Sequence, residues 1–182
     1  MLPDVLQKGL DVVFVGTAAS TVSARQGIYY ANPQNRFWPT LEEIGLIPKG
    51  FDRRDFLRAP EFGIGFTDLC KTRAGMDHAL ARSDFDVDLL AAKLRQAMPR
   101  AVAFTSRKGA SVFLACRSAE LKLGTPLVHD SDFPPVFALP SPSGAARGHW
   151  DVAPWRRLAR WLKARQARPR ERGFAPGNGG RS

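Results

Sequence analysis

Two segments that lie far apart in the chain carry side chains suited to holding a nucleotide. Residues 27–38 read Gly-Ile-Tyr-Tyr-Ala-Asn-Pro-Gln-Asn-Arg-Phe-Trp, which offers aromatic faces and side-chain amides to a flat heterocycle. Residues 139–147 read Leu-Pro-Ser-Pro-Ser-Gly-Ala-Ala-Arg, a small-residue loop that ends in a cation and suits close approach to a phosphate backbone. Together the two segments indicate an enzyme that acts on a base swung out of a nucleic acid.

The net charge points to a polyanionic partner. The 182-residue chain has 27 Lys and Arg against 17 Asp and Glu, which gives a formal charge of +10. Nine of the cations lie from Val152 onward, against the single acid Glu171, so this stretch supplies +8 of the total. Nucleic acid is the natural partner of such a stretch. The alternative is a solvated helix face that continues into a basic tail.

The rest of the composition is that of one soluble domain. A chain of 182 residues with 44% hydrophobic content can build one substantial core. Cys70 and Cys116 are too few for a disulfide framework, and free thiols fit a reducing cytosol. No apolar run reaches membrane-spanning length, and we see no signal peptide. We therefore expect a cytoplasmic monomer without a membrane partner. No set of histidines and cysteines resembles a zinc site, and we expect no metal or cofactor.

Strand and helix patterns alternate along the chain. Short apolar runs predict strands at residues 12–15, 62–66, 101–104, 126–128 and 135–139. Helical periodicity and caps predict helices at 36–44, 51–58, 87–98, about 106–118 and about 152–167. Asn35, Asp86 and Ser106 are the expected N-caps. The alternation predicts a three-layer αβα domain over residues 1–167, with a central, mostly parallel sheet of four to five strands. Residues 168–182 form a basic tail that we expect to be disordered.

Three candidate segments leave predicted strands at their carboxyl ends. These are the small-residue turn of residues 16–20, the Thr-Asp-Leu-Cys stretch of residues 67–70, and the loop of residues 140–147. Ligands of open α/β sheets bind at this edge. We therefore expect the three segments to meet at one site. The turn lacks the glycines of a dinucleotide-binding fingerprint.

The strand, the Gly turn, the block Gly-x-x-Tyr-Ala-x-Pro-x-Asn-Arg-Phe-Trp and the late Pro-Ser-Gly-x-x-Arg loop resemble the mismatch-specific uracil/thymine-DNA glycosylases of the uracil-DNA glycosylase superfamily. The resemblance spans about residues 11–162. The Tyr-Tyr-Ala-Asn-Pro stretch also resembles the hypoxanthine-DNA glycosylase branch. The resemblance implies that Tyr30 stacks on the extruded base, with Tyr29 as the alternative.

Three departures from the family pattern concern the water, the late loop and the wedge. The family carries an Asn in its first turn that positions the attacking water, and this chain has Ala18 there. The late motif begins with Asn in the family and with Ser141 here, and the wedge position holds only Ala145. Asp68, expected just past the second strand, is our candidate for holding the water and stabilising the charge on the sugar. Ser20 and Asn35 are alternatives for holding the water.

Further candidates would bind the base and the DNA backbone. Groups around Thr17 and Ala18, together with the Asn35 side chain, are the candidates for reading the base edge; Asn35 could equally serve only as a helix cap. The expected DNA contacts come from one loop, through Ser141, Ser143, Gly144, Ala145 and Arg147. Lys71, Arg73 and Arg107 near strand ends could add phosphate contacts or be solvated charges.

These observations predict a monofunctional DNA glycosylase that excises uracil, with other deaminated bases as further substrates, from single- or double-stranded DNA. One alternative is a hypoxanthine-excising enzyme. Another, suggested by Ala18, is an inactive binder of damaged or single-stranded DNA. A nucleotide-binding α/β enzyme with a basic tail is a third, although a phosphate-binding loop is missing.

Overall fold

A computed structural model describes residues 2–72, 84–127, 132–144, 148 and 150–166. In chain order, its elements are β1 (Val12–Ala18), α1 (Thr21–Gln26), α2 (Phe37–Glu43), η1 (Arg53–Phe62), β2 (Ile64–Cys70), α3 (Val87–Ala97), β3 (Ala101–Phe104), α4 (Arg107–Phe113), η4 (Ser118–Glu120), β4 (Val136–Ala138) and α5 (Ala153–Gln166). Within these ranges, no helix combines the length and the apolar character needed to cross a bilayer.

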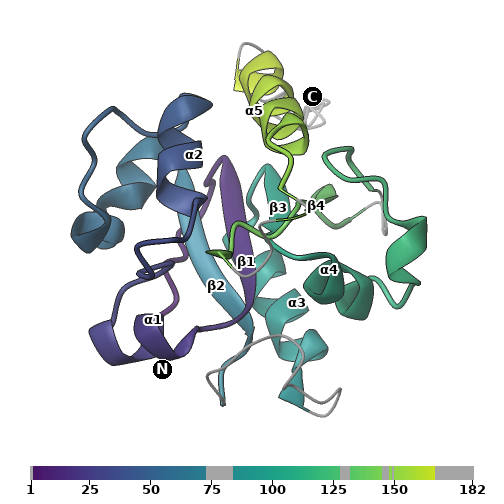
Figure 1. Ribbon diagram of the computed structural model, residues 1–182. Coiled ribbons are helices and arrows are strands. Elements are labelled where there is room, and N and C mark those ends of the chain that lie inside the picture. The colour runs from purple at the N-terminus through teal and green to yellow at the C-terminus, as the bar shows by residue number, and fades with distance from the viewer. Residues whose placement is uncertain (1, 73–83, 128–131, 145–147, 149, 167–182) are drawn as a thin grey trace, which may run out of the picture.

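A parallel sheet of four strands lies at the centre of the fold, in the order β2-β1-β3-β4. Successive residues of β1 face opposite layers. Phe14 belongs to a core shared with α2, η1 and α5, whereas Val15 belongs to a core shared with α3 and α4. In Figure 1, α2 lies to the left of the sheet, α3 and α4 lie to the right, and α5 lies at the top. This is the predicted three-layer αβα fold, with four strands that are all parallel.

Aromatic packing fixes the first loop against the sheet. Phe37, at the start of α2, contacts Phe14 of β1 edge-on at a centroid distance of 5.1 Å, and Trp155 of α5 stacks on Phe14 at 5.9 Å. The Trp38 indole nitrogen donates to the carbonyl of Tyr29 at 2.9 Å. Phe37 and Trp38 are both buried, so the motif that carries them is part of the core. The loop that carries the tyrosines is therefore tied to the core of the domain.

The two strands that lead to the site are longer than predicted. β1 does not stop at Gly16 but continues to Ala18, and β2 begins at Ile64 and runs to Cys70. Gly16 lies opposite Asp68 in the parallel register, and Ala18 lies opposite Cys70. The prediction that Asp68 follows its strand was wrong: Asp68 lies inside β2, because ladder pairing with β1 continues past the glycine.

Other boundaries also differ from the prediction. Between the predicted strand at 12–15 and the predicted helix at 36–44, where no helix was predicted, the structure has α1, which Ser20 caps and Gly27 ends in the left-handed conformation. The predicted helix at 51–58 is the 3₁₀ stretch η1, displaced toward the chain's C-terminus. The helix capped by Ser106 ends at Phe113. Of the predicted strand at 126–128, Leu127 makes only an isolated bridge to β4, and Val128 lies outside the described residues.

Candidate active site

A cavity of about 700 Å³ opens at the carboxyl edge of β1, β2 and β3. It brings together the first turn, the tyrosine loop, the middle of β2 and the late loop, as their strand-end positions suggest. Its lining residues are Leu2, Gly16, Thr17, Ala18, Ala19, Ser20, Thr21, Val22, Ser23, Tyr29, Tyr30, Asn32, Gln34, Asn35, Asp68, Thr105, Ser106, Ser141, Pro142, Ser143 and Gly144. The candidates Ala145 and Arg147 lie outside the described residues.

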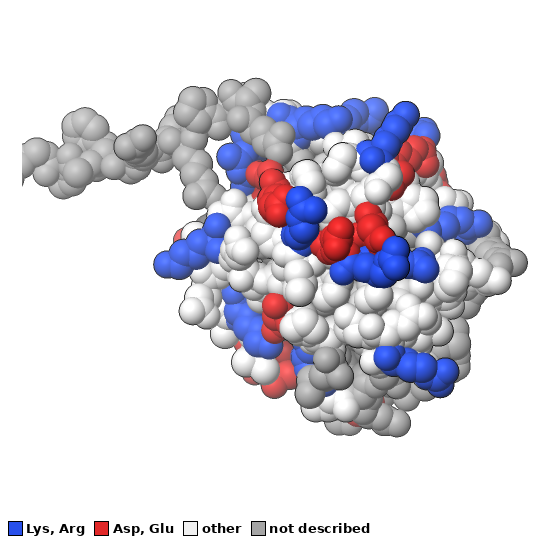
Figure 2. Space-filling view, turned by 90° about the vertical axis from the view of Figure 1, so that its left-hand side faces the viewer, with Lys and Arg blue, Asp and Glu red and all other residues white. Residues whose placement is uncertain are grey.

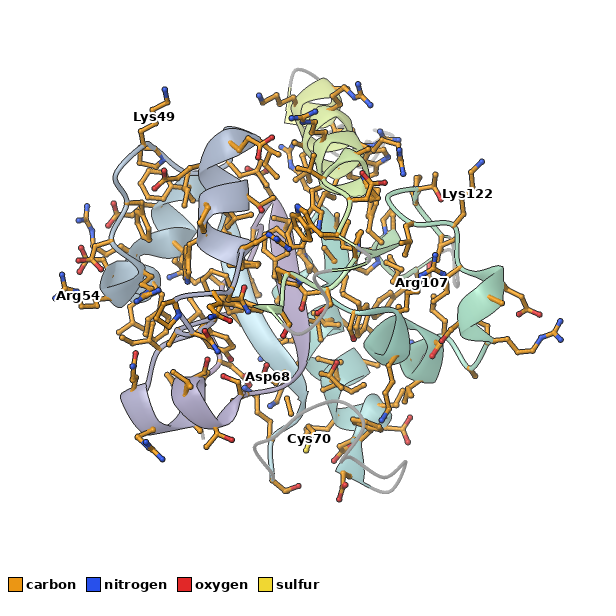
Figure 3. All side chains as sticks on the ribbon, viewed as in Figure 1. Lys49, Arg54, Asp68, Cys70, Arg107 and Lys122 are labelled. Atoms are coloured by element: carbon orange, nitrogen blue, oxygen red, sulfur yellow. The ribbon has the colours of Figure 1, made fainter. Side chains whose placement is uncertain are left out.

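Asp68 is a buried carboxylate in the wall of this cavity, with only 6% of its surface exposed. It lies beside Gly16 on the neighbouring strand, and a Cβ at Gly16 would collide with the Asp68 Oδ1 atom. Glycine at position 16 therefore makes room for the carboxylate, and a larger residue there would displace it. In Figure 3 the labelled Asp68 lies at the lower part of β2, near α1.

The surroundings of Asp68 place its titration close to neutral pH. Burial raises the pKa of Asp68 to about 6, while the Lys71 ammonium and the Tyr29 hydroxyl oppose that rise. Lys71 Nζ lies 3.6 Å from Asp68 Oδ2. Burial, followed by the nearby charge of Asp68, raises the pKa of Tyr29, so that its hydroxyl stays protonated and can donate. Above pH 6 the site therefore holds a carboxylate that can orient a water and accept its proton.

Tyr30 presents an aromatic ring to the cavity from a backbone with φ of 53°, in the left-handed region. Its ring stacks on Phe37 at a centroid distance of 3.8 Å and 14° between planes. Its hydroxyl lies 3.1 Å from Thr105 Oγ1. Phe37 thus covers one face of the ring and fixes its orientation at the cavity.

Tyr29, the alternative stacking residue, belongs to the core. It is 2% exposed, and its ring packs on Phe56 and Phe66 at centroid distances of 5.7 and 5.3 Å. The Lys71 ammonium lies 5.7 Å from the centre of the same ring. The Tyr29 ring is therefore poorly placed for stacking on a base, and its hydroxyl, 3.1 Å from Lys71 Nζ, is its polar contribution to the site.

The polar candidates of the first turn are engaged in local structure. Ser20 Oγ accepts from the Ser23 amide at 3.1 Å and donates to Ser23 Oγ at 3.0 Å, as the cap of α1. Thr17 Oγ1 lies 2.7 Å from Ser106 Oγ, which in turn accepts from the Gly109 amide at 3.0 Å. These contacts make Ser20 a weaker candidate for holding a water than Asp68, and they leave the Thr17–Ser106 pair as part of the cavity wall.

Ala18 and Asn35 are both at the cavity. Ala18 ends β1, where its methyl group offers no polar atom. Asn35 Oδ1 accepts from the Phe37 amide at 2.9 Å. Asn35 thus caps the first turn of α2 through its oxygen, although the residue at the cap position itself is Arg36. The capping role and the cavity position are compatible, since an Asn side chain also carries an NH₂ group.

The late loop packs directly on the tyrosine loop. The Arg36 amide donates to the carbonyl of Pro142 at 2.9 Å. A Cβ at Gly144 would lie 2.9 Å from Gln34 Cβ, which is closer than side chains normally approach. The Ser143 amide donates to Ser141 Oγ at 3.3 Å, which shapes the turn. The expected meeting of these two motifs is therefore present, at the rim of the same cavity.

Several residues at or behind the cavity were not predicted from the sequence as site residues, or were predicted to have another role. Thr105 and Ser106 follow β3 at its carboxyl end, and this position after a strand is the sequence feature that could have identified them as site residues. Lys71, expected to contact phosphate or solvent, is instead packed beside Asp68 with 18% of its side chain exposed. Its other ion-pair partner, Asp4, has no local signal at all. Arg107 donates to backbone carbonyls of η4 and its flank, and Arg73 lies outside the described residues.

Positive charge gathers at the other end of the molecule. The Arg100 guanidinium, just before β3, donates to the carbonyl of Arg165 at 2.9 Å, so α5 ends at the amino edge of the sheet. Figure 2 shows Lys and Arg along the top, where α5 lies. Lower on that face, basic and acidic side chains alternate. Exposed ion pairs such as Arg54–Asp52 and Arg58–Glu61 occur at η1.

A parallel αβα sheet with a buried carboxylate, an aromatic ring and two small-residue loops at one cavity describes an α/β protein with a ligand site at its carboxyl edge. The family model of the uracil DNA glycosylase superfamily matches residues 3–165. The chain belongs to this superfamily, whose members act on DNA, and membership supports a DNA glycosylase.

One solved structure is similar over nearly its whole length. It is the solution NMR structure of a "putative Uracil DNA glycosylase" from Methanosarcina acetivorans, with 22% sequence identity and a TM-score of 0.62. The match covers 89% of this chain and 96% of that chain. At this identity the similarity shows a shared fold.

Proposed function

We propose that this protein is a monofunctional DNA glycosylase that excises uracil from DNA by hydrolysing the N-glycosidic bond, the first step of base excision repair. The observation that carries the proposal is the buried carboxylate of Asp68 in the wall of a cavity that Tyr30 also lines. Family membership supports the reaction class, and the cavity supports a flipped base as the ligand.

In the proposed reaction the base enters the cavity and stacks on the Tyr30 ring, which lines the cavity. Thr17, Thr105 and Ser106 are polar side chains of the wall, and hydroxyls can both donate to and accept from a base edge. The bond from the sugar C1′ to the base nitrogen breaks, and its electron pair leaves with the base as an anion. Asp68 stabilises the positive charge that develops on the sugar. It also orients a water whose oxygen bonds to C1′ and whose proton passes to the carboxylate.

The loop that holds Ser141, Ser143 and Gly144 would grip the strand beside the flipped nucleotide, with Ala145 or Arg147 entering the gap. Hydroxyl and backbone N–H groups at this rim suit phosphate contacts. The cationic end of α5 and the basic tail would add affinity that falls with salt. Because α5 ends at the far edge of the sheet, the charges at its end would meet DNA away from the excised base.

A hypoxanthine-excising enzyme is the second candidate. A cavity of about 700 Å³ exceeds what one pyrimidine ring requires and also admits a purine. Rotatable hydroxyls can satisfy the carbonyl and the ring N–H that uracil and hypoxanthine share. The same wall thus fits either deaminated base.

Synthetic oligonucleotides with one uracil or one hypoxanthine, single-stranded and in duplex, test the proposal. Alkaline cleavage of the abasic product measures excision by the wild type, by Asp68→Asn and by Asp88→Asn, a matched change on the exposed first turn of α3. We expect excision of uracil by the wild type and by Asp88→Asn, and a large loss with Asp68→Asn. Tight binding without abasic product from any substrate would instead identify a DNA binder.

A further inference from the structure

Lys71 lies behind the cavity in a pocket of oxygen atoms. Its Nζ lies 2.6 Å from Asp4 Oδ1, 3.1 Å from the Tyr29 hydroxyl, 3.3 Å from the carbonyl of Leu2 and 3.6 Å from Asp68 Oδ2. The ammonium is therefore closer to Asp4, at the beginning of the chain, than to the carboxylate of the site. Only 18% of the Lys71 side chain is exposed, so water screens these interactions weakly.

Asp4 is itself held firmly. Thr67 Oγ1 donates to Asp4 Oδ1 at 2.6 Å, and Lys93 of α3 donates to Oδ2 at 2.8 Å. Burial raises the pKa of Asp4, but the hydrogen bonds from Lys71, Lys93 and Thr67 outweigh burial and lower that pKa below its ordinary value. Asp4 is consequently ionised throughout the neutral range and competes with Asp68 for the Lys71 charge.

The backbone around Asp4 is built into the sheet. Val5 and Phe66 of β2 exchange two hydrogen bonds, of 2.8 and 2.9 Å, in an antiparallel bridge. Gly65 leaves room for this contact, since a Cβ there would lie 2.5 Å from the Val5 carbonyl oxygen. Leu2, three residues earlier, lines the cavity. The N-terminal segment, residues 2–5, is thus an edge piece of β2 that reaches the candidate site.

We propose that Asp4 and Lys71 form a positioning pair, through which the N-terminal segment holds the Lys71 ammonium near enough to keep Asp68 ionised but too far to neutralise it in a short ion pair. This inference rests on the proposed function of Asp68. Neither Asp4 nor Lys71 has to touch the DNA. Both act through the carboxylate, and Asp4 sets how much of the Lys71 charge Asp68 receives.

A general base works best when its pKa lies near the pH at which the enzyme operates. Without a cation, a carboxylate this buried would take up a proton, whereas a direct short pair would make it a weak base. Within the part of the chain that the structure describes, the charged or titratable groups that face Asp68 are Lys71, Tyr29, Asp4 and, across Gly16, the Tyr30 hydroxyl. Among them, Lys71 favours the ionised form, and Asp4 opposes it.

The two members of the pair therefore have opposite predicted effects. Lys71→Met removes the cation. It should move the acid limb of the pH–rate profile of excision to higher pH by about one unit or more. Asp4→Asn removes a repelling charge and releases Lys71 toward Asp68, so it should move the limb to lower pH. Lys71→Arg should restore the wild-type limb in part. A merely supporting role would lower the rate at every pH and leave the limb in place.

The experiment combines two readouts on the full chain. Single-turnover excision from a uracil duplex is measured between pH 4.5 and 8.5, and the Asp68 carboxyl ¹³C shift is titrated by NMR without DNA. Lys122→Met serves as the control, because Lys122 is exposed and lies far from Asp68 in Figure 3. Opposite displacements of the Asp68 titration in Lys71→Met and Asp4→Asn support the pair. Displacements that are absent, or that share one direction, overturn it.

The NMR titration separates this inference from the proposed function. If the variants displace the titration but the wild type releases no base, the proposed function fails while the pair stands. If the wild type excises uracil and the titration does not move, the pair fails alone. Should Lys71→Met not fold, Asp4→Asn decides. Loss of structure in Asp4→Asn would expose Asp68 and return its titration to an ordinary value whatever residue stands at position 71. Combining Asp4→Asn with Lys71→Arg therefore shows whether the displacement of the Asp68 titration depends on Lys71.

Discussion

Replacing Asp68 by Asn removes a charge while keeping the shape of the side chain, and its effects on excision and on stability should have opposite signs. For excision, the variant loses the anion beneath the sugar and the acceptor for the water proton. Electrostatic stabilisation of this kind is worth about 10²- to 10³-fold in rate, and proton transfer is worth about 10²- to 10⁴-fold. We expect the single-turnover rate at pH 7.5 to fall at least about 100-fold.

For stability, the sign follows from the raised pKa of Asp68. Burial raises this pKa from 3.8 to about 6, so the folded protein binds the proton more tightly than the unfolded chain does. The stability that this provides is fully present below pH 4 and is lost as the pH rises through 6. A change from 3.8 to about 6 corresponds to about 3 kcal/mol. Asn resembles the protonated acid and avoids that loss, while Lys71 keeps Asp4 as a partner.

Urea unfolding of both proteins at pH 4.5 and 7.5, beside the excision assay, tests this reasoning. The free energy of unfolding of Asp68→Asn should exceed that of the wild type by up to about 3 kcal/mol at pH 7.5, with a much smaller difference at pH 4.5. An Asn variant that is less stable than the wild type at pH 7.5 would show that the buried charge is fully compensated. Excision at the wild-type rate would show that Asp68 has no part in the chemistry.

Three further outcomes are expected. Gly16→Ala should reduce excision at least about 10-fold by displacing the Asp68 carboxylate, whereas Gly148→Ala, where a Cβ meets no atom of the described residues within 4 Å, should leave the rate unchanged; both are measured in single-turnover assays. Ala18→Asn should excise uracil as fast as the wild type or faster, and a large loss would mean that the position tolerates no amide. Changing the four arginines of residues 168–182 to Gln should make the log–log salt slope of duplex binding shallower by up to about 3.6 without changing the rate at saturation.

Local patterns were sufficient where neighbouring residues decide the structure. Helix α3 begins after Asp86, whose carboxylate accepts from the Leu89 amide, and α4 begins after Ser106, whose hydroxyl accepts from the Gly109 amide. Both caps act within three residues, so the sequence displays them. Strand β3 was predicted to the residue, because a short apolar run between two helices has little freedom in a parallel sheet.

Contacts between distant residues were not predictable in the same way. Gly16 reads locally as the end of a strand, but its role is to admit the carboxylate of a residue on the next strand. Asp4 and Lys71 meet only because the N-terminal segment pairs with the edge of β2. The sequence alone shows Asp4 near the beginning of the chain and Lys71 after a strand. Without the strand register, nothing in the sequence connects the two residues.

Under the proposed function, the same register accounts for a site that has no amide in its first turn. Gly16 and Ala18 are two residues apart on β1 and share a face of the sheet, and the parallel pairing sets Asp68 and Cys70 beside them. A carboxylate on this face replaces a neutral amide with a full charge at the same edge. Such a charge is useful beneath an oxocarbenium-like sugar only if it remains ionised in a buried position. A buried carboxylate of this kind therefore depends on the arrangement behind it, in which a lysine held by a second acid supports the charge. Ala18 and the Asp4–Lys71 pair are then two consequences of moving the polar group from one strand to its neighbour.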